Sequence, residues 1–432
     1  MNPLVKRTLA TALLVSTPMV ANATNGLFMI GQGVKSVGMG GVVIAFPQDA
    51  LAGATNPAAI GEIGTRFDLE ATLFLPSAQA SVYISPEKGS INSKSRANMF
   101  LIPGLGFTMP VDNETAFGFS MVGAGGGGTH YKQNLYDLTH NVNGTGLPNT
   151  GDLGVDLMVM QMNPTMSQKL NPNNTVGVSV VMGLQRFKAF GLGDFNTFTS
   201  TGASTTNLTN RGVEYSRGLG MRFGWLGSFP GIGLTLGAAA TSKVYMTKFQ
   251  NYSELFAENG DLDTPANVGA GIGLKITPKL TIAMDIIRTY YSKVRSISNI
   301  GPPSDGSAFP IGQEVNALGL DGGLGFGYDD QIVYKLGVNY VQNSKWTWRG
   351  GWNYGKSPVK EEREIAFSIV APAVTQHHAT LGATYKINRE METSFAYMHA
   401  FAYEQSGPIY VGETGTIKMS QNSFGASLGF AF

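Results

Sequence analysis

Two short motifs in the chain match patterns that carry chemistry in other proteins. Residues 425–429 fit the GxSxG pattern of a nucleophilic serine, and Gly123, Gly125 and Gly128 fit the GxGxxG pattern of a dinucleotide site. The serine pattern needs a sharp turn from strand to helix, and the glycine pattern needs a following helix. Ser427 stands in an extended, alternating segment, and no helical pattern follows Gly128. Neither motif therefore predicts an enzyme.

The histidines show no arrangement that would hold a metal ion. His377 and His378 are neighbours, and neighbouring side chains in a strand point to opposite faces. His130, His140 and His399 show no ligand spacing with carboxylates. The sequence contains no Cys, which excludes disulfides, thiolate nucleophiles and Cys-ligated zinc. Neither a metal ion nor another cofactor is predicted.

The start of the chain has the three parts of a secretory signal peptide. Lys6 and Arg7 precede an apolar stretch over residues 9–20, and residues 21–23 form a small-residue cleavage site. The stretch is shorter than the roughly 20 apolar residues of a membrane-spanning helix. We therefore expect residues 1–23 to be removed during export.

The composition favours a membrane protein built of strands. Hydrophobic residues make up 43% of the chain, yet no later apolar run is long enough for a membrane helix. Charged residues make up 14%, against roughly 25% in soluble domains, and 57 of 432 residues are Gly, well above the usual share of about 7%. The net charge of +1, without a basic run beside aromatic residues, argues against a nucleic-acid partner.

Apolar residues alternate with small or polar residues in many segments, as expected for strands between lipid and a lumen. Near the end of the chain, Phe424, Leu428 and Phe430 alternate with Ser423 and Ser427. The pattern predicts fourteen strands, near residues 67–84, 96–110, 115–127, 155–170, 174–188, 211–228, 231–247, 266–277, 280–294, 329–341, 345–355, 376–387, 392–404 and 421–432.

The connections between these segments alternate in length. Tight turns such as 111–114 and 171–173 alternate with long polar connections such as 128–154 and 295–328. Short turns on one side and long loops on the other are typical of an outer-membrane barrel with an even number of strands. A soluble β-sandwich also alternates, but it has no reason to segregate its loops. We predict an all-β fold, a transmembrane antiparallel β-barrel over residues 67–432 in the outer membrane of a Gram-negative cell.

Residues 24–66 precede the first strand and do not alternate. They are rich in Gly and Ala, too long for a frayed tail and too apolar for a linker. A fourteen-stranded barrel encloses a lumen wider than its own side chains can fill. We expect this segment to be a plug, called the hatch below, inside the lumen.

Several motifs in the hatch match one known family. They are Thr24-Asn25-Gly26-Leu27-Phe28, GQGVKSVGMGG at residues 31–41, Pro47-Gln48-Asp49-Ala50 and Thr55-Asn56-Pro57-Ala58. With these motifs, the fourteen strands and the terminal Phe432, the chain resembles the long-chain fatty-acid transporters of the FadL type. The resemblance implies a monomeric barrel, not an enzyme, that takes up fatty acids or other hydrophobic compounds, including aromatic hydrocarbons in relatives.

The resemblance also assigns candidate ligand-binding residues in the hatch. Asn56, Pro57 and Ala58 match the family's NPA motif at the inner wall of the barrel, and Leu27 and Phe28 belong to the first hatch motif. A side-chain amide offers both a donor and an acceptor in a site that is otherwise apolar. Asn-Pro is also a common turn pair, which is the structural alternative.

The glycine run 123–128 ends the third predicted strand. Glycine within a strand often marks a bulge or a kink, and the family's third strand is kinked to open the wall toward lipid. Gly125, Gly126 and Gly127 are therefore candidates for a lateral opening. The alternative is that they are the flexible start of a loop.

A carboxylate ligand would need a cation in the lumen. Arg186 and Lys188 look like the family's Arg and Lys on the fifth strand, which makes them counter-ion candidates. Arg186 nevertheless has the same parity as the lipid-facing Met182 and Leu184. It faces the lumen only if a bulge intervenes.

The expected mechanism moves ligand between apolar sites, because removing apolar surface from water is worth roughly 25 cal/mol per Å². Ligand would be captured in an extracellular apolar groove, the hatch would rearrange, and ligand would leave sideways through the wall. The groove would be formed by two long connections, or these would only pack on the rim; their apolar residues are Tyr131, Leu135, Tyr136 and Leu138 in the first and Tyr252, Leu255 and Phe256 in the second. Uptake is expected to fall when Asn56 becomes Ala or when Gly125 and Gly126 become bulky.

Two rival functions stay open. A general hydrophilic porin would need opposed charges at a constriction and no plug, and an outer-membrane lipid hydrolase would need a nucleophile with His support. The expected partners are a hydrophobic small molecule, outer-membrane lipid and lipopolysaccharide, and the barrel-assembly machinery through Phe432.

Overall fold

A computed structural model describes residues 25–87, 89–136, 151–201, 205–301, 317–360, 364–410 and 413–432 of the protein. The predicted signal peptide, residues 1–23, lies outside the described residues, as do Thr24, His140 and Leu138. Within the described part, no helix is both long and apolar enough to cross a membrane.

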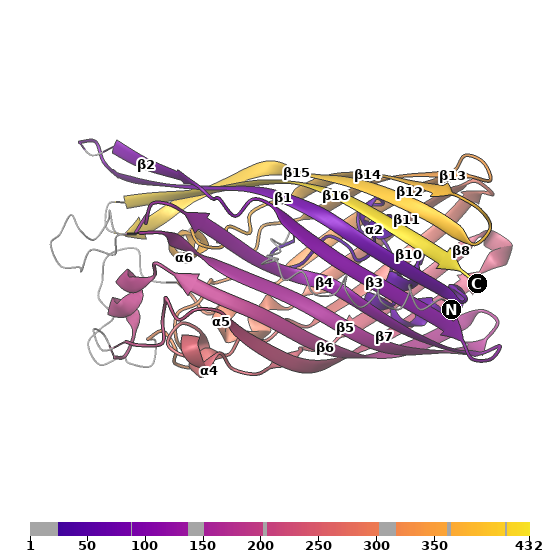
Figure 1. Ribbon diagram of the computed structural model, residues 1–432, viewed down its shortest axis with the longest axis horizontal. Helices are drawn as coiled ribbons and strands as arrows, with labels where there is room; N and C mark the ends of the chain where they lie inside the picture. Colours follow the sequence, from indigo (N-terminus) through magenta and orange to yellow (C-terminus); the bar gives the residue numbers. More distant parts are fainter. Residues whose placement is uncertain are drawn as a thin grey trace, which may run out of the picture.

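Fourteen of the described strands close into one antiparallel barrel (Figure 1). Each strand pairs with its neighbours in chain order, and β1 closes the ring against β16. The short β2 pairs with the end of β1, and β9 adds two residues beside β7. The strands are β1 (Arg66–Ser85), β2 (Gly89–Lys94), β3 (Phe100–Pro110), β4 (Thr115–Tyr131), β5 (Leu153–Asn171), β6 (Asn174–Phe190), β7 (Glu214–Phe229), β8 (Leu234–Thr241), β9 (Tyr245–Met246), β10 (Asn267–Thr277), β11 (Leu280–Thr289), β12 (Gln331–Val341), β13 (Trp346–Gly355), β14 (His377–Lys386), β15 (Met391–Tyr410) and β16 (Glu413–Ala431). The predicted fourteen-stranded barrel is confirmed.

The strands are apolar on the outside and polar on the inside. Phe424 and Leu428 of β16 are 51% and 38% exposed, whereas Ser423 and Ser427 between them are buried. This is the reverse of a soluble protein, and it follows from lipid on one side and a polar lumen on the other. The period of two in the sequence therefore reports directly which side chains face the lumen.

The two ends of the barrel carry different connections. The short turns lie at the end where Ala431 of β16 pairs with Arg66 of β1. One of them is closed by Asp112, whose carboxylate accepts hydrogen bonds from the backbone N–H groups of Glu114 and Thr115 at 2.8 and 2.7 Å. The long connections fold over the opposite end and carry α4, α5 and α6 (Figure 1). Their helices are η3 (Gly193–Phe198), η6 (Gln250–Tyr252), α4 (Ala257–Gly260), η7 (Tyr291–Lys293), α5 (Arg295–Ser298) and α6 (Ile365–Ser368), while η5 (Pro230–Ile232) lies in a short turn.

The hatch fills the lumen, with α2 (Val34–Val37) enclosed by the strands (Figure 1). Two 3-10 helices follow it, η1 (Ala50–Ala54) and η2 (Pro57–Glu62). Asp49 caps η1 and Asn56 caps η2, because their side chains accept hydrogen bonds from Leu51 N and Ala58 N, and Pro57 stands in the first turn of η2. Local sequence therefore determines the two turns that hold the hatch motifs.

Inward-facing glycines of the barrel let the hatch backbone approach the wall. A Cβ atom added at Gly224 would lie 2.0 Å from Asn56 Oδ1, and one at Gly177 would lie 2.4 Å from Ala58 N. Side chains at these positions would displace the hatch. The high glycine content of the chain thus serves, in part, the packing of the plugged lumen.

Buried ion pairs tie the hatch to the barrel on the other side. Lys35 of α2 forms an ion pair with Glu392 of β15, and their side chains are 6% and 11% exposed. Arg66 of β1 also contacts Glu392, at 2.5 Å, and pairs with Asp68 at 2.7 Å. Because Glu392 is shared by both cations, its charge balances the hatch lysine against the wall.

Candidate functional site

An apolar cavity of about 70 Å³ lies at the loop end of the lumen. Strands β5 and β6, four long connections and the start of the hatch contribute to it. Its described lining is Leu27, Gly127, Val155, Leu157, Phe187, Leu192, Phe195, Leu255, Phe256, Leu262, Ser296, Ile297, Leu324, Gly325, Phe326, Tyr328, Phe367, Val370 and Ala371. None of these side chains carries a charge, so the cavity offers apolar contact and aromatic rings.

The two hydroxyl groups that line the cavity are already used. Ser296 donates a hydrogen bond to Asp261 O, and Tyr328 donates one to Ala371 O at 3.3 Å. Burial raises the pKa of the Tyr328 phenol well above its usual value, and the nearby Tyr291 acts in the same direction. Tyr328 therefore stays neutral, and a ligand in the cavity meets few polar groups that lack a partner.

Aromatic rings from the loops close the cavity over Phe187 of β6. The centroid of the Phe187 ring lies 4.8 Å from the ring centroids of both Tyr252 and Phe256. Leu255 and Phe256 line the cavity, as expected for a capture groove. Tyr131, Leu135 and Tyr136 are buried in the same hydrophobic cluster without lining the cavity, so they match the alternative of packing at the rim.

The wall beside this cavity is interrupted between β3 and β4. These strands pair only from Pro110↔Ala116 to Leu105↔Met121, although β4 continues to Tyr131 against β5. Above the gap, the described chain is joined again where Arg96 N donates to His130 O at 2.8 Å. The register of β4 shifts between Gly123 and Gly125, so the glycine run contains a β-bulge.

The hatch takes the hydrogen bonds that β3 leaves free on β4. Gly126 N donates to Leu27 O at 3.0 Å, and Met29 N donates to Ala124 O at 3.2 Å. Phe28 forms an isolated antiparallel bridge with Gly125. A Cβ atom at Gly125 would lie 2.0 Å from Leu27 O, so glycine is required for this contact. Residues 27–29 therefore stand at the gap like a short substitute strand.

A second hollow, of about 720 Å³, lies along the interrupted wall. It is lined in part by Phe100 of β3, Thr129 and His130 of β4, and Val155 of β5. Val155 also lines the apolar cavity, so the two hollows meet at one side chain. The candidates Leu27 and Gly127 line the inner cavity beside this point.

Arg186 and Lys188 do not face the lumen, which corrects their assignment as counter-ions there. The register of β6 against β7 is continuous from Asn174 to Phe187, so no bulge turns Arg186 inward. Arg186 instead has the parity of the exposed Met182 and forms an ion pair with Asp156 at 2.5 Å. Phe187 between the two cations is the residue that reaches the cavity. Both cations line the hollow along the wall.

Asn56 holds three parts of the molecule together. Its Nδ2 donates to Ile44 O at 2.8 Å and to Trp225 O of β7 at 3.1 Å, and its Oδ1 accepts from Ala58 N at 3.1 Å. The side chain is fully buried. Asn56, Pro57 and Ala58 therefore lie at the wall of β7, away from the apolar cavity, and Asn56 is a docking residue of the hatch.

Asn56→Ala is expected to weaken hatch docking by about 2 kcal/mol or more, because two carbonyl groups lose their donor in a buried site. Hydrogen exchange of the backbone amides near residues 56–60 measures this, and it should become faster. The control is Asn92→Ala, an exposed position of β2. Equal exchange in the two variants would contradict the docking role of Asn56.

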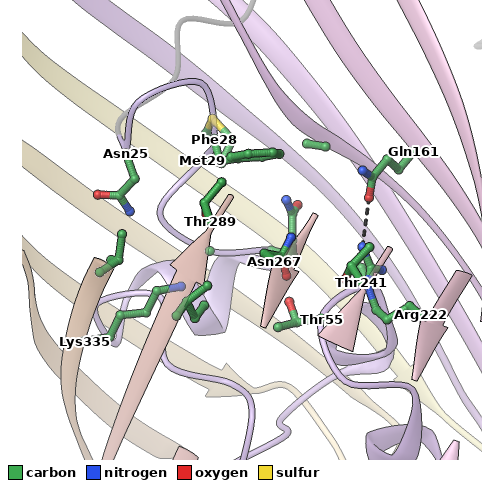
Figure 2. A pocket seen from close by; sticks show the side chains of 16 residues that line it. Asn25, Phe28, Met29, Thr55, Gln161, Arg222, Thr241, Asn267, Thr289 and Lys335 are labelled. Atoms are coloured by element: carbon green, nitrogen blue, oxygen red, sulfur yellow. Dashed lines mark hydrogen bonds between the residues drawn. The ribbon is translucent and has the colours of Figure 1, made fainter. Parts of the chain in front are cut away.

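A polar cavity of about 100 Å³ lies below the apolar one, between hatch and wall (Figure 2). The hatch side is lined by Asn25, Phe28 and Met29, among others. The barrel side presents the buried cations Arg222 and Lys335. Sequence analysis missed Arg222; the signal was a lone Arg with the inward parity of a strand.

The motifs that resembled chemical sites have structural roles here. Ser427 lies within β16, and Gly123, Gly125 and Gly128 lie within β4, so neither motif opens a helix. Among the described residues no group of three or more His, Asp or Glu side chains could hold a metal ion.

Comparisons with known proteins agree with this architecture. A family model described as outer membrane protein transport protein (OMPP1/FadL/TodX) matches residues 21–407. The fold is similar to three solved structures. They are the toluene transporter TodX of Pseudomonas putida (TM-score 0.67, 18% identity, 93% of this chain and 99% of that chain), a FadL homologue of Pseudomonas aeruginosa (0.65, 16%, 94% and 100%) and the toluene transporter TbuX of Ralstonia pickettii (0.63, 20%, 93% and 99%). A comparison with curated proteins found no match.

Proposed function

Because the chain belongs to the outer membrane protein transport family (OMPP1/FadL/TodX), we propose that it takes up small, neutral, hydrophobic molecules, with single-ring aromatic hydrocarbons as the preferred class. Membership in this family makes the chain an outer-membrane transport protein and not an enzyme. The relatives TodX and TbuX are described as toluene transporters. The preferred ligand of this chain is argued below from its own cavity.

The uncharged lining of the apolar cavity carries the proposal. A carboxylate placed there would lose its water and meet no cation, which costs several kcal/mol. A neutral ring loses little and gains contact with Phe187, Phe256 and Phe367. The volume of about 70 Å³ is below the roughly 150 Å³ of a cavity that admits benzene, so the loops must yield slightly for one ring and far more for a long alkyl chain.

The interrupted wall gives the proposed route. Ligand is captured among the loop aromatics, residues 27–29 of the hatch leave the edge of β4, and ligand passes Val155 into the hollow along the wall. The two backbone hydrogen bonds to the hatch are a modest barrier, of about 1 kcal/mol each. Release into the membrane then follows the gradient of apolar contact.

Uptake by whole cells tests the ligand class. In a strain that lacks the chain, restoring it is expected to raise uptake of radiolabelled toluene and to leave uptake of radiolabelled oleate unchanged, because the cavity has no counter-ion. Surface abundance is checked by immunodetection on intact cells. A rise for oleate without a rise for toluene would reverse the assignment to neutral rings.

The hatch argues against the rival function of a hydrophilic porin. Residues 25–65 occupy the lumen, and steady ion current in planar bilayers is therefore expected to be small. A large steady current through the purified protein would favour the porin. The monomeric state, contact with lipopolysaccharide and recognition by the assembly machinery through Phe432 stay predictions.

A further inference from the structure

Arg222 is buried in the lumen without an acidic partner. It is 5% exposed, and none of the ion pairs of the described residues includes it. Its guanidinium donates to three neutral acceptors, Thr241 Oγ1 at 2.9 Å, Asn163 Oδ1 at 3.2 Å and Gln161 Oε1 at 3.0 Å. A guanidinium has five N–H donors, and a buried charge with only neutral partners is costly.

This Arg faces the polar cavity between hatch and wall (Figure 2). Lys335 stands on the far side, where its ammonium group donates to Ile30 O at 2.7 Å and Gly41 O at 3.2 Å. The described residues that line the cavity include these two cations and no carboxylate. The neutral polar groups Thr289 and Asn267 lie between them (Figure 2). The cavity is thus electropositive and rich in hydrogen-bond donors.

The same cavity has an apolar side. Phe28 and Met29 of the hatch and Ile287 and Val333 of the barrel line it together with the polar groups. A guanidinium binds a carboxylate through two parallel hydrogen bonds, and apolar walls suit the body of an organic acid. Leu27 lines the apolar cavity and Phe28 lines the polar one, so residues 27–28 separate the two.

We infer that the polar cavity is a binding site for a small hydrophobic monocarboxylate, such as an aromatic acid, with Arg222 as its counter-ion. The site is separate from the apolar cavity and accepts the charged class of ligand that the apolar cavity rejects. Movement of residues 27–28 would join the two cavities. The chain would then accept both a neutral ring and its carboxylated counterpart.

Calorimetric titration of the purified, full-length protein in detergent tests the site with sodium benzoate as the probe. Benzoate is expected to bind saturably, and Arg222→Met is expected to lower its affinity roughly tenfold or more, because charge-assisted hydrogen bonds are lost. Arg217→Met is the matched control on the same strand, since Arg217 is exposed, and it should leave benzoate affinity unchanged. Binding of toluene should be equal in all three proteins, which separates this site from the proposed function.

Three results would overturn the inference. They are no saturable benzoate binding by the unaltered protein, equal benzoate affinity after Arg222→Met, and tighter binding of inorganic phosphate than of benzoate. If Arg222→Met does not fold, as judged by heat-modifiable gel mobility, crystals of the unaltered protein soaked with 4-bromobenzoate decide. Anomalous scattering from bromine beside Arg222 and Thr289 supports the site, and a bromine peak elsewhere rejects it.

Discussion

Replacement of Gly127 by Phe is expected to lower toluene uptake roughly tenfold or more. Gly127 lines the apolar cavity, and a Cβ atom added there has no other atom within 4 Å. The side chain of Phe has the size and shape of toluene itself. Tethered at the wall, its ring occupies the cavity as an intramolecular competitor at high effective concentration. Uptake of radiolabelled toluene at equal surface abundance measures the effect.

Two further variants make this result specific. Gly231→Phe is the matched control, because Gly231 also has open space around its Cβ position but lies in the short turn of η5. It should leave uptake unchanged. Gly127→Ala should have a small effect, since one methyl group leaves most of the cavity open. Normal uptake by the Gly127→Phe variant would falsify the assignment of the cavity.

Substitution of Glu392 by Gln is expected to release the hatch. Lys35 and Arg66 would lose the carboxylate that they share, and breaking a buried pair in this way costs about 3 kcal/mol or more. The cost falls on the contact between α2 and β15, because Lys35 is the hatch residue of the cluster. Ion conductance in planar bilayers should rise, and cells should become sensitive to vancomycin, which is too large and polar for a plugged barrel.

The control lies on the same strand. Glu404 of β15 pairs with Lys418 at 3.0 Å, and both side chains are about half exposed, so Glu404→Gln removes a surface pair worth at most about 1 kcal/mol. Its conductance should equal that of the unaltered protein. Equal conductance in Glu392→Gln would show that other contacts suffice to hold the hatch, against the anchoring role of the ion pairs.

Gly125 and Asn56 illustrate how motif and structure complement each other. The sequence marked the glycine run as a bulge, and the register of β4 confirms the bulge itself. That residues 27–29 bond to this run could not be predicted, because the contact joins segments almost a hundred residues apart. In the same way the NPA motif predicted a turn, while its hydrogen bond to Trp225 O depends on where β7 lies.

The sequence by itself determined the barrel, its strand faces, the segregation of its loops and the presence of a hatch. These follow from local rules: a strand shows its two faces with a period of two, and turns and caps use particular residues. The tertiary structure alone decided the outward position of Arg186, the gap between β3 and β4 and the isolated charge of Arg222. These depend on which strands pair, in which register, and on loops that meet only after the barrel closes. Such choices are made between distant segments, where no local pattern in the chain records them.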